Sequence, residues 1–212
     1  MTAQISDKYR YEDKVYSVVA MSNPIGFDPQ NYGLEPHPSS SACWRGYWCE
    51  YAIKDEKLIL EKLLMFNEDD NYPDFNGIKV SPQEYEEVKY YTFDKGKKVY
   101  HKEMEPANDG HRTYEANMEL NYTGKIVLGD EFMRDYYIHM GFQRPWAYKV
   151  LKEFDFVDGK LKGIIDHSNV AKELREMIER DPEGFSKMLR SNIPAFIEDS
   201  FSLDASIKAW WI

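Results

Sequence analysis

The sequence predicts a mainly β protein of the α+β class: an antiparallel, meandering sheet, barrel-like or sandwich-like, with two to three C-terminal helices packed on it. Three observations predict this fold. Short alternating segments separated by turn signals run to about residue 166, aromatic residues make up 15% of the 212 residues, and a helical pattern follows. Large rings suit a pleated, half-buried surface, so the aromatic excess favours strands. At this length we expect one domain.

Five turns share one pattern, in which an acidic or glycine-containing pair precedes a lysine and an alternating apolar segment. They lie in EDKVYSV (12–18), DEKLILEKL (55–63), DKGKKVYHKE (94–103), YTGKIVLGDE (122–131) and VDGKLKGII (157–165). Asp158-Gly159 is the strongest signal, because a type I′ turn needs positive φ at both central positions. The uneven spacing of the turns excludes a solenoid or propeller repeat and favours a meander of hairpins.

Two strand segments differ in the number of faces that they bury. Residues 148–157 alternate between an apolar face and a polar face, which is typical of an antiparallel sheet with one wet side. The apolar face holds Tyr148, Val150, Phe154 and Phe156, and the polar face holds Lys149, Glu153 and Asp155. The segment KLILEKLLMF (57–66) has apolar residues in both registers, so we expect this strand to be covered on both sides.

Helical periodicity begins after Ile165. Val170, Leu174, Met177 and Ile178 form the first apolar stripe, and Ser168 or Asn169 can cap its start. Asp181-Pro182 places a cap residue before a proline at N1 and predicts a second helix, which ends before Pro194. A third short helix is expected around 193–201. Each stripe must bury against the sheet.

We therefore expect a single domain over 1–212, with a β-rich body (1–166), a helical cap (167–204) and a C-terminal strand or docking tail (205–212). The tail ends in Trp210-Trp211-Ile212. Exposed large apolar residues form a sticky patch, so these residues either fold back as an edge strand or pack on a partner. The sequence leaves both interpretations open.

The charge pattern constrains partners and location. The formal net charge is −10, which disfavours nucleic acid and anionic membranes. The acidity either only keeps the protein in solution or suits a basic protein partner, and a small-molecule ligand is the other candidate partner. The chain starts with no apolar run after basic residues and has no stretch long enough to span a membrane. Two cysteines are too few for an exported disulfide framework, so the cytoplasm is the expected location.

The segment SSSACWRGYWCEYAI (39–53) places Cys43 and Cys49 among several rings. If the segment is extended at about 3.3 Å per residue, the two sulfurs stand about 20 Å apart, too far to share a metal or a disulfide. Only a sharp bend at Arg45-Gly46 would bring them together. We therefore expect both cysteines to be buried in an extended ribbon, with no metal and no cofactor. Arg45 and Trp48 are the candidate ligand-binding residues if this segment forms a partner surface.

A second cluster, DYYIHMGFQRPWAY (135–148), carries the other candidate residues, Tyr137, His139, Arg144 and Trp146. A histidine can serve as a general base, an arginine can hold an anion, and aromatic rings can stack on a flat ligand. The same residues are compatible with a strand that bends at Gly141 and Pro145. No hydrolase, nucleotide-binding or zinc-protease motif occurs along the chain.

Two irregular stretches, 22–43 and 67–82, interrupt the strands. Long loops on a rigid scaffold often carry function, although each of these also suits an ordinary surface excursion. The acidic residues of the second stretch lack the ordered spacing of a calcium-binding loop, so we expect no calcium there.

Two functions remain compatible with the sequence. The first is a non-catalytic binding module that recognises a protein or small ligand through aromatic-rich loops; its most specific version is an acidic immunity-type or inhibitor-type protein. The second is an enzyme with a concave pocket at one mouth of the sheet that uses His139 and Arg144. The identity of the ligand, the strand order and the oligomeric state stay open at this point.

Overall fold

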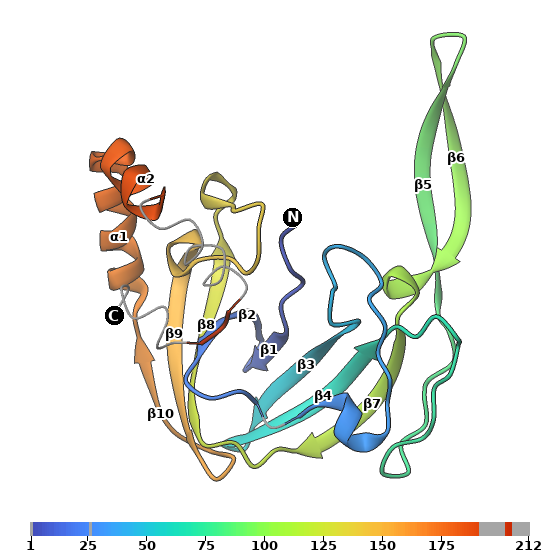
Figure 1. Cartoon of the computed structure of the whole chain (residues 1–212), viewed down its shortest axis with the longest axis horizontal. Helices are drawn as coiled ribbons and strands as arrows, with labels where there is room; N and C mark the ends of the chain where they lie inside the picture. Colours follow the sequence, from blue (N-terminus) through green and yellow to red (C-terminus); the bar gives the residue numbers. More distant parts are fainter. Residues whose placement is uncertain (1, 26, 191–201, 205–212) are drawn as a thin grey trace.

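The computed structural model has the predicted fold class: a mainly β protein with a barrel-like sheet and two helices packed on it (Figure 1). It describes residues 2–25, 27–190 and 202–204. In these residues the strands are β1 (Lys8–Tyr11), β2 (Lys14–Met21), β3 (Tyr47–Lys54), β4 (Lys57–Met65), β5 (Tyr85–Asp94), β6 (Lys97–Pro106), β7 (Arg112–Glu119), β8 (Gly124–Phe132), β9 (Tyr148–Val157) and β10 (Lys160–Asp166). The helices are α1 (Ser168–Arg180) and α2 (Pro182–Arg190).

Eight of these strands form one curled sheet in the order β10-β9-β8-β2-β1-β3-β4-β7. A backbone pair between Lys160 in β10 and Lys57 in β4 joins the far parts of the sheet and gives it a barrel-like closure. Register shifts interrupt four of the strand pairs, at Val18/Ala20, Glu50/Tyr51, Leu60/Lys62 and Leu161/Gly163. Because an extra residue bends a strand and increases its twist, these shifts help the sheet to curl.

One pair of neighbouring strands is parallel, which a meander does not predict. β1 pairs antiparallel with β2 and parallel with β3. The connection 22–46 leaves the end of β2 and returns on the other side of β1, and parallel neighbours need a crossover of this kind. The order of the strands is therefore set by a long connection whose path the local sequence pattern does not reveal.

Three predicted turns have positive φ at both central residues, as a type I′ hairpin turn requires. They are Asp55-Glu56, Lys95-Gly96 and Asp158-Gly159. The segment at Thr123-Gly124 is different, since β7 and β8 are not neighbours in the sheet and Gly124 simply begins β8. The shared pattern predicts the start of a strand at all five places, but not always a hairpin.

The main core gathers rings and aliphatic side chains from both halves of the sheet. Tyr9 and Tyr51 stack with ring centroids 4.7 Å apart. Phe27, from the connection 22–46, and Phe75, from the connection between β4 and β5, are buried in the same core. Both irregular stretches therefore contribute to packing, and neither is a simple surface excursion.

β4 is covered on both sides, as its sequence predicts. Leu58 and Leu60 lie in the main core, whereas Leu64 packs in a separate cluster with Cys43 and Trp48. Cys43, near the end of the connection 22–46, contributes the side chain that packs with Trp48 and Leu64 in this second cluster.

α1 packs on β9 and differs in detail from the predicted helix. Ala171 and Arg175 are its buried residues, and the Arg175 guanidinium donates hydrogen bonds to the carbonyl oxygens of Trp146 (3.1 Å) and Tyr148 (2.6 Å). Met177 is 61% exposed, so its place in the predicted stripe is wrong. The predicted cap is also wrong: His167 is the N-cap residue, and Ser168 is the first residue of the helix.

The expected wet face of β9 is partly buried because α1 covers it. Leu151 and Glu153 are both buried. The carboxylate of Glu153 lies 2.7 Å from Lys125 Nζ and 3.3 Å from His167 Nε2, so its charge is paired. The alternation of residues 148–157 predicted the correct strand but the wrong exposure for Glu153.

Asp181 caps α2 as predicted, since its carboxylate accepts a hydrogen bond from the backbone N–H of Gly184 (2.9 Å). The predicted third helix around 193–201 and the tail 205–212 fall outside the described residues. In the part of the chain that is described, no helix is both long and apolar enough to cross a bilayer.

Candidate binding surface

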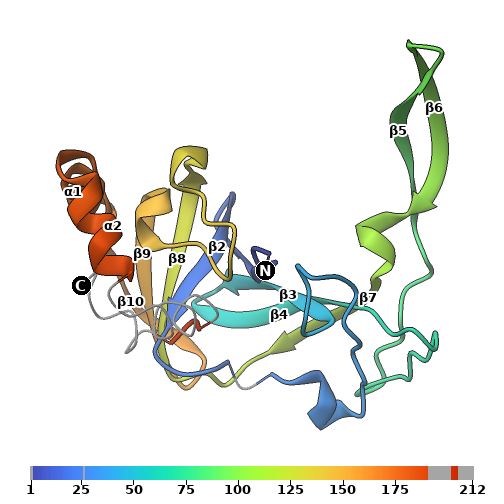
Figure 2. The same ribbon diagram turned by 45° about the horizontal axis from the view of Figure 1, so that its top comes forward.

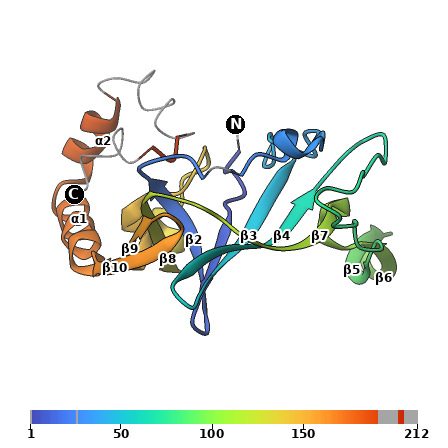
Figure 3. The same ribbon diagram turned by 90° about the horizontal axis from the view of Figure 1, so that it is seen from below.

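β5 and β6 form a two-stranded ribbon, the arm (residues 85–106), that stands away from the barrel. Ten residue pairs run without a register shift from Tyr85↔Pro106 to Asp94↔Lys97. The arm is a separate sheet and lies at the end of the molecule remote from α1 and α2 (Figures 1, 2 and 3). At about 3.4 Å per residue it is about 30 Å long.

The two faces of the arm have different compositions, because side chains alternate along each strand. We call one of them the aromatic face. It consists of Tyr85, Glu87, Lys89, Tyr91, Phe93, Lys98, Tyr100, Lys102, Met104 and Pro106. Its rings are exposed: Phe93 is 66% and Tyr100 is 75% accessible. Exposed rings gathered on one face are typical of an interaction surface.

The rings of the aromatic face contact one another near the tip of the arm. Tyr91 packs edge-on against Phe93, with centroids 5.6 Å apart, and lies 6.3 Å from Tyr100 across the ladder. Lys98 Nζ lies 4.4 Å from the centroid of Tyr91. A cation over an exposed ring gives only a small stabilisation, and Tyr91 remains 51% exposed despite this contact.

The opposite face is polar and uses its groups internally. Tyr90 stacks on His101 with centroids 5.0 Å apart and donates a hydrogen bond from its hydroxyl to Glu103 (2.6 Å), a bond that raises the pKa of Tyr90. The hydroxyl of Thr92 lies 2.7 Å from His101 Nε2. Because these side chains already contact one another, the opposite face offers fewer free groups to a partner than the aromatic face does.

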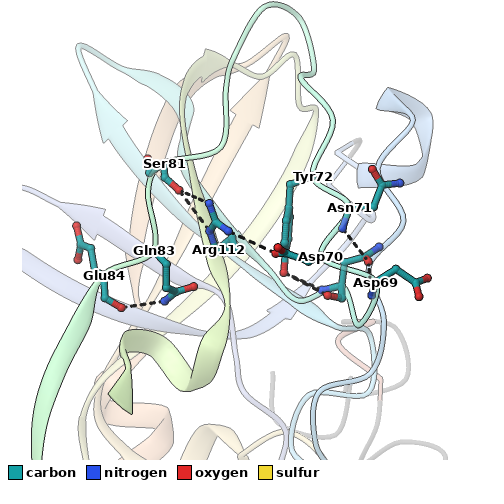
Figure 4. A network of polar contacts seen from close by, with 9 residues as sticks. Asp69, Asp70, Asn71, Tyr72, Ser81, Gln83, Glu84 and Arg112 are labelled. Atoms are coloured by element: carbon teal, nitrogen blue, oxygen red, sulfur yellow. Dashed lines mark hydrogen bonds and ion pairs between the residues drawn. The ribbon is translucent and has the colours of Figure 1, made fainter. Parts of the chain in front are cut away.

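A network of polar contacts holds the base of the arm to the barrel (Figure 4). The guanidinium of Arg112, at the start of β7, donates to the carbonyl oxygen of Ser81 (3.0 Å) and lies 3.5 Å from the carboxylate of Asp70. The same group lies 5.1 Å from the ring of Tyr72. The backbone N–H of Ala107 donates to the Glu84 carbonyl (2.9 Å) and extends the ladder below the arm.

His111 forms a second anchor at the base. It is only 2% exposed, and its ring lies 4.3 Å from that of Trp48. Nδ1 lies 2.8 Å from the carbonyl oxygen of Asn108 and Nε2 lies 3.1 Å from the Ser39 hydroxyl. A carbonyl can only accept, so Nδ1 carries the proton and Nε2 accepts from Ser39. Burial lowers the pKa of His111, so the ring is neutral at pH 7.

The residues predicted from the segment 39–53 make contacts within the fold. The chain bends at Arg45-Gly46 and β3 begins only at Tyr47, so the expectation of an extended ribbon from Cys43 is wrong. Gly46 has φ 72°, and a side chain there would collide with the backbone of His37. Despite the bend, both cysteines are free and buried in different clusters, as the packing interpretation predicts.

Arg45 and Trp48 are both used within the fold. Arg45 forms a two-pronged ion pair with Asp7, whose carboxylate also accepts the backbone N–H of Cys49 (2.7 Å). Trp48 is buried beside His111. These contacts give both residues a role in packing.

The candidates from the segment 135–148 lie in two different environments. Tyr137 and His139 are exposed and pack edge-on, with centroids 4.7 Å apart. Arg144 is fully buried, and Trp146 packs its ring against Phe185 of α2 at 5.3 Å. The structure therefore brings Tyr137 to His139 and Trp146 to the helices, but it does not gather the six candidates into one site.

A cavity of about 280 Å³ links the two predicted segments through the N-terminal residues. Ile5, Cys43, Trp44 and Arg45 line one part of it, and Phe142 lines another. Trp44 is 67% exposed, yet the sequence pattern singled out neither it nor Phe142. The sequence feature that could have identified Trp44 is its position directly before the bend at Arg45-Gly46. A residue at that position does not belong to the strand that follows, so its ring is not placed in the sheet.

The described residues contain no group of three or more side chains placed to hold a metal ion. In the acidic stretch 67–82, Asp70 instead pairs with Arg112 and the Asn67 side chain accepts backbone N–H groups. Comparison with known proteins found no matching family model, no similar curated protein and no similar solved structure. The geometry of the arm is therefore the basis for a functional proposal.

Proposed function

We propose that this protein is a non-catalytic binding module that recognises another protein through the aromatic face of its arm. The observation that carries the proposal is the exposure of Tyr91, Phe93 and Tyr100 on one side of a ribbon that stands clear of the barrel. Tyrosine and phenylalanine are enriched at the centres of protein interfaces, and tyrosine is among the residue types that most often provide the largest share of the binding energy.

The energetics of a free ribbon support this proposal. An isolated two-stranded hairpin is at best marginally stable in water, because it has one layer and buries little apolar surface. Full burial of one large apolar side chain contributes roughly 1.5–3 kcal/mol. Association on the aromatic face would both bury these rings and stabilise the ribbon, whereas no comparable gain is available on the opposite face.

The test is a matched pair of double variants. Tyr91→Thr/Phe93→Thr removes rings from the aromatic face, and Tyr90→Thr/Val99→Thr removes apolar groups from the opposite face; threonine retains the strand propensity in both. Each tagged variant is used for quantitative affinity capture. Every protein that is captured is then purified and titrated against both double variants. We expect the first variant to weaken binding at least tenfold and the second to leave it unchanged. Equal binding by both variants would refute the proposal.

The narrower version, an acidic immunity-type or inhibitor-type protein with a basic partner, stays a prediction. The net charge of −10 supports it. The tip of the arm does not, since residues 89–102 carry Lys89, Lys95, Lys97, Lys98 and Lys102 against Asp94, a formal charge of +4. A basic partner would therefore dock on the acidic barrel, and an acidic surface would suit the tip of the arm.

The catalytic alternative at His139 and Arg144 also stays a prediction, and it has less support. His139 is exposed beside Tyr137 and does not line the cavity that contains Trp44 and Phe142. Arg144 is fully buried. A cytoplasmic location is likewise a proposal, supported by two thiols that are free and buried.

A further inference from the structure

The arm is strongly polarised along its length. Its base, residues 85–88 and 103–106, carries Glu86, Glu87, Glu103 and Glu105 and no lysine or arginine, a formal charge of −4. Its tip, residues 89–102, has a formal charge of +4. On the aromatic face this polarity is carried by Glu87 near the base and by Lys89, Lys98 and Lys102 from the centre to the tip, since the other glutamates of the base lie on the opposite face. A copy of the arm that runs in the opposite direction therefore brings Glu87 toward the basic end of this face.

We infer that a second copy of this chain docks on the aromatic face, with the two arms packed face to face and antiparallel around a two-fold axis. The inference rests on the proposed function, because it names the partner of the same surface. A two-fold contact is reciprocal, so each tip lies against the base of the other arm, and the approach of Glu87 to the basic tip occurs twice. The exposed rings of both copies lie in the same interface.

The charges on the aromatic face favour one alignment of the two arms. In one alignment, the tip of each arm lies level with the base of the other. Lys89 and Lys102, at the centre, then face the same lysines of the second copy, and like charges opposite one another are unfavourable. A shift by two residues, one layer of this face, instead places Lys89 and Lys102 over the rings of Tyr91 and Tyr100 of the second copy. This arrangement allows cation–π contacts and removes the repulsion.

The same alignment brings Glu87 of one copy into the layer that holds Lys98 of the other. Within one copy, Glu87 lies opposite Met104 and Lys98 lies opposite Phe93, and these two layers are about 20 Å apart at about 3.4 Å per residue. Glu87 instead contacts Lys89 (3.4 Å) and Lys102 (3.1 Å) of its own arm through exposed ion pairs, which are weak. A Glu87–Lys98 contact is therefore specific to the dimer, and it occurs twice.

The size of the interface sets the expected affinity. A ribbon face about 30 Å long and about 10 Å wide is smaller than the roughly 800 Å² that each partner buries in an interface of standard size. We expect a dissociation constant in the micromolar range, about 1–100 µM. The dimer is then visible in a concentration series and absent in dilute solution.

The experiment uses charge complementation, followed by sedimentation velocity of the full chain from about 1 to about 300 µM. In Glu87→Lys both reciprocal contacts join two lysines, and in Lys98→Glu both join two glutamates. Each variant alone is expected to dimerise at least tenfold more weakly than the wild type. In an equimolar mixture, one contact joins the introduced lysine to the introduced glutamate and the other joins native Glu87 to native Lys98. The mixture is expected to dimerise within about threefold of the wild type.

Glu86→Lys is the matched control, since it makes the same charge change one residue away on the opposite face. It is expected to dimerise like the wild type. Far-ultraviolet circular dichroism and thermal melting of each variant check that the barrel is folded, and the arm, as a separate sheet, is not expected to change the melting temperature.

Three outcomes would overturn the inference: a wild type that is monomeric throughout the series, single variants that dimerise normally, or a mixture that does not regain association. The proposed function fails independently, through the threonine variants. A monomer whose partner binding still depends on Tyr91 and Phe93 would reject the second copy and retain the binding surface.

Discussion

The barrel and the arm contain the same kinds of residue and treat them in opposite ways. In the barrel, Tyr9, Tyr114 and Phe154 are fully buried, and in the arm, Tyr91, Phe93 and Tyr100 lie in solvent. Strand propensity is satisfied in both regions, so it does not explain the difference. The barrel has connections and helices packed around its sheet, whereas the arm has a single layer. Burial follows from the presence of a second layer, which the arm lacks; under the proposed function, a partner supplies it.

The largest expected effect on stability comes from removing a ring from the core of the barrel. Phe154→Ala removes a ring from the centre of the barrel and is expected to lower the free energy of unfolding by about 3–5 kcal/mol. Phe93→Ala removes the same ring from the arm and is expected to change it by less than about 1 kcal/mol. Urea unfolding followed by tryptophan fluorescence measures both. Similar losses in the two variants would mean that the arm packs on the barrel.

Acidification tests the anchor between the two regions. Burial holds the pKa of His111 below its usual value of 6.5, so the folded state binds this proton more weakly than the unfolded state does. The stabilisation is therefore complete above about pH 6.5 and is lost as the pH falls through the folded-state pKa. Each unit of depression corresponds to about 1.4 kcal/mol of stability lost at low pH.

The measurement is the urea midpoint of the wild type and of His111→Asn between pH 7.5 and 4.5. Asparagine can replace one of the two hydrogen bonds but does not titrate in this range. The wild type is expected to lose more stability than the variant on acidification. Parallel pH profiles would show that His111 does not titrate as a buried group.

The smallest expected effect concerns a hydroxyl in the barrel. Tyr9 is fully buried and its hydroxyl has no hydrogen-bond partner among the described residues, whereas Tyr122 donates its hydroxyl to the Asn23 carbonyl (3.0 Å). Tyr9→Phe removes an unsatisfied group and is expected to raise the free energy of unfolding by about 1 kcal/mol. Tyr122→Phe is expected to lower it by about the same amount. Thermal melting of the two variants checks the signs, and a destabilised Tyr9→Phe would reveal a partner for that hydroxyl.

Local patterns predicted the elements well and their environment poorly. The sequence identified the hairpin turn at Asp158-Gly159, the Asp181 cap and the two-sided burial of β4, because each depends on residues close in sequence. It did not identify the parallel β1–β3 pair or the burial of Glu153, because both depend on segments that return from far along the chain.

Residues 85–106 were not predicted to stand away from the barrel, although their charge pattern indicates it. Alternation in residues 85–106 suggests ordinary strands, but lysines or glutamates occur on both faces of the ladder. Charged residues recur along both faces of the arm, so neither face is suited to a core, whereas LILEKLLM in β4 has six apolar residues beside Glu61 and Lys62. The candidate residues of 39–53 and 135–148 were selected for their chemistry, and the fold uses Arg45, Trp48 and Trp146 for packing.

The central claim, that a protein covers the aromatic face of the arm, can be tested most directly by carbene footprinting with mass spectrometry. Labelling is compared between dilute purified protein and intact cells that express it. The account predicts that Tyr91, Phe93 and Tyr100 are labelled strongly in dilute solution and protected several-fold in cells, while Tyr90 and Val99 on the opposite face change little. Equal labelling of the two faces in cells, at the level seen in dilute solution, would contradict it.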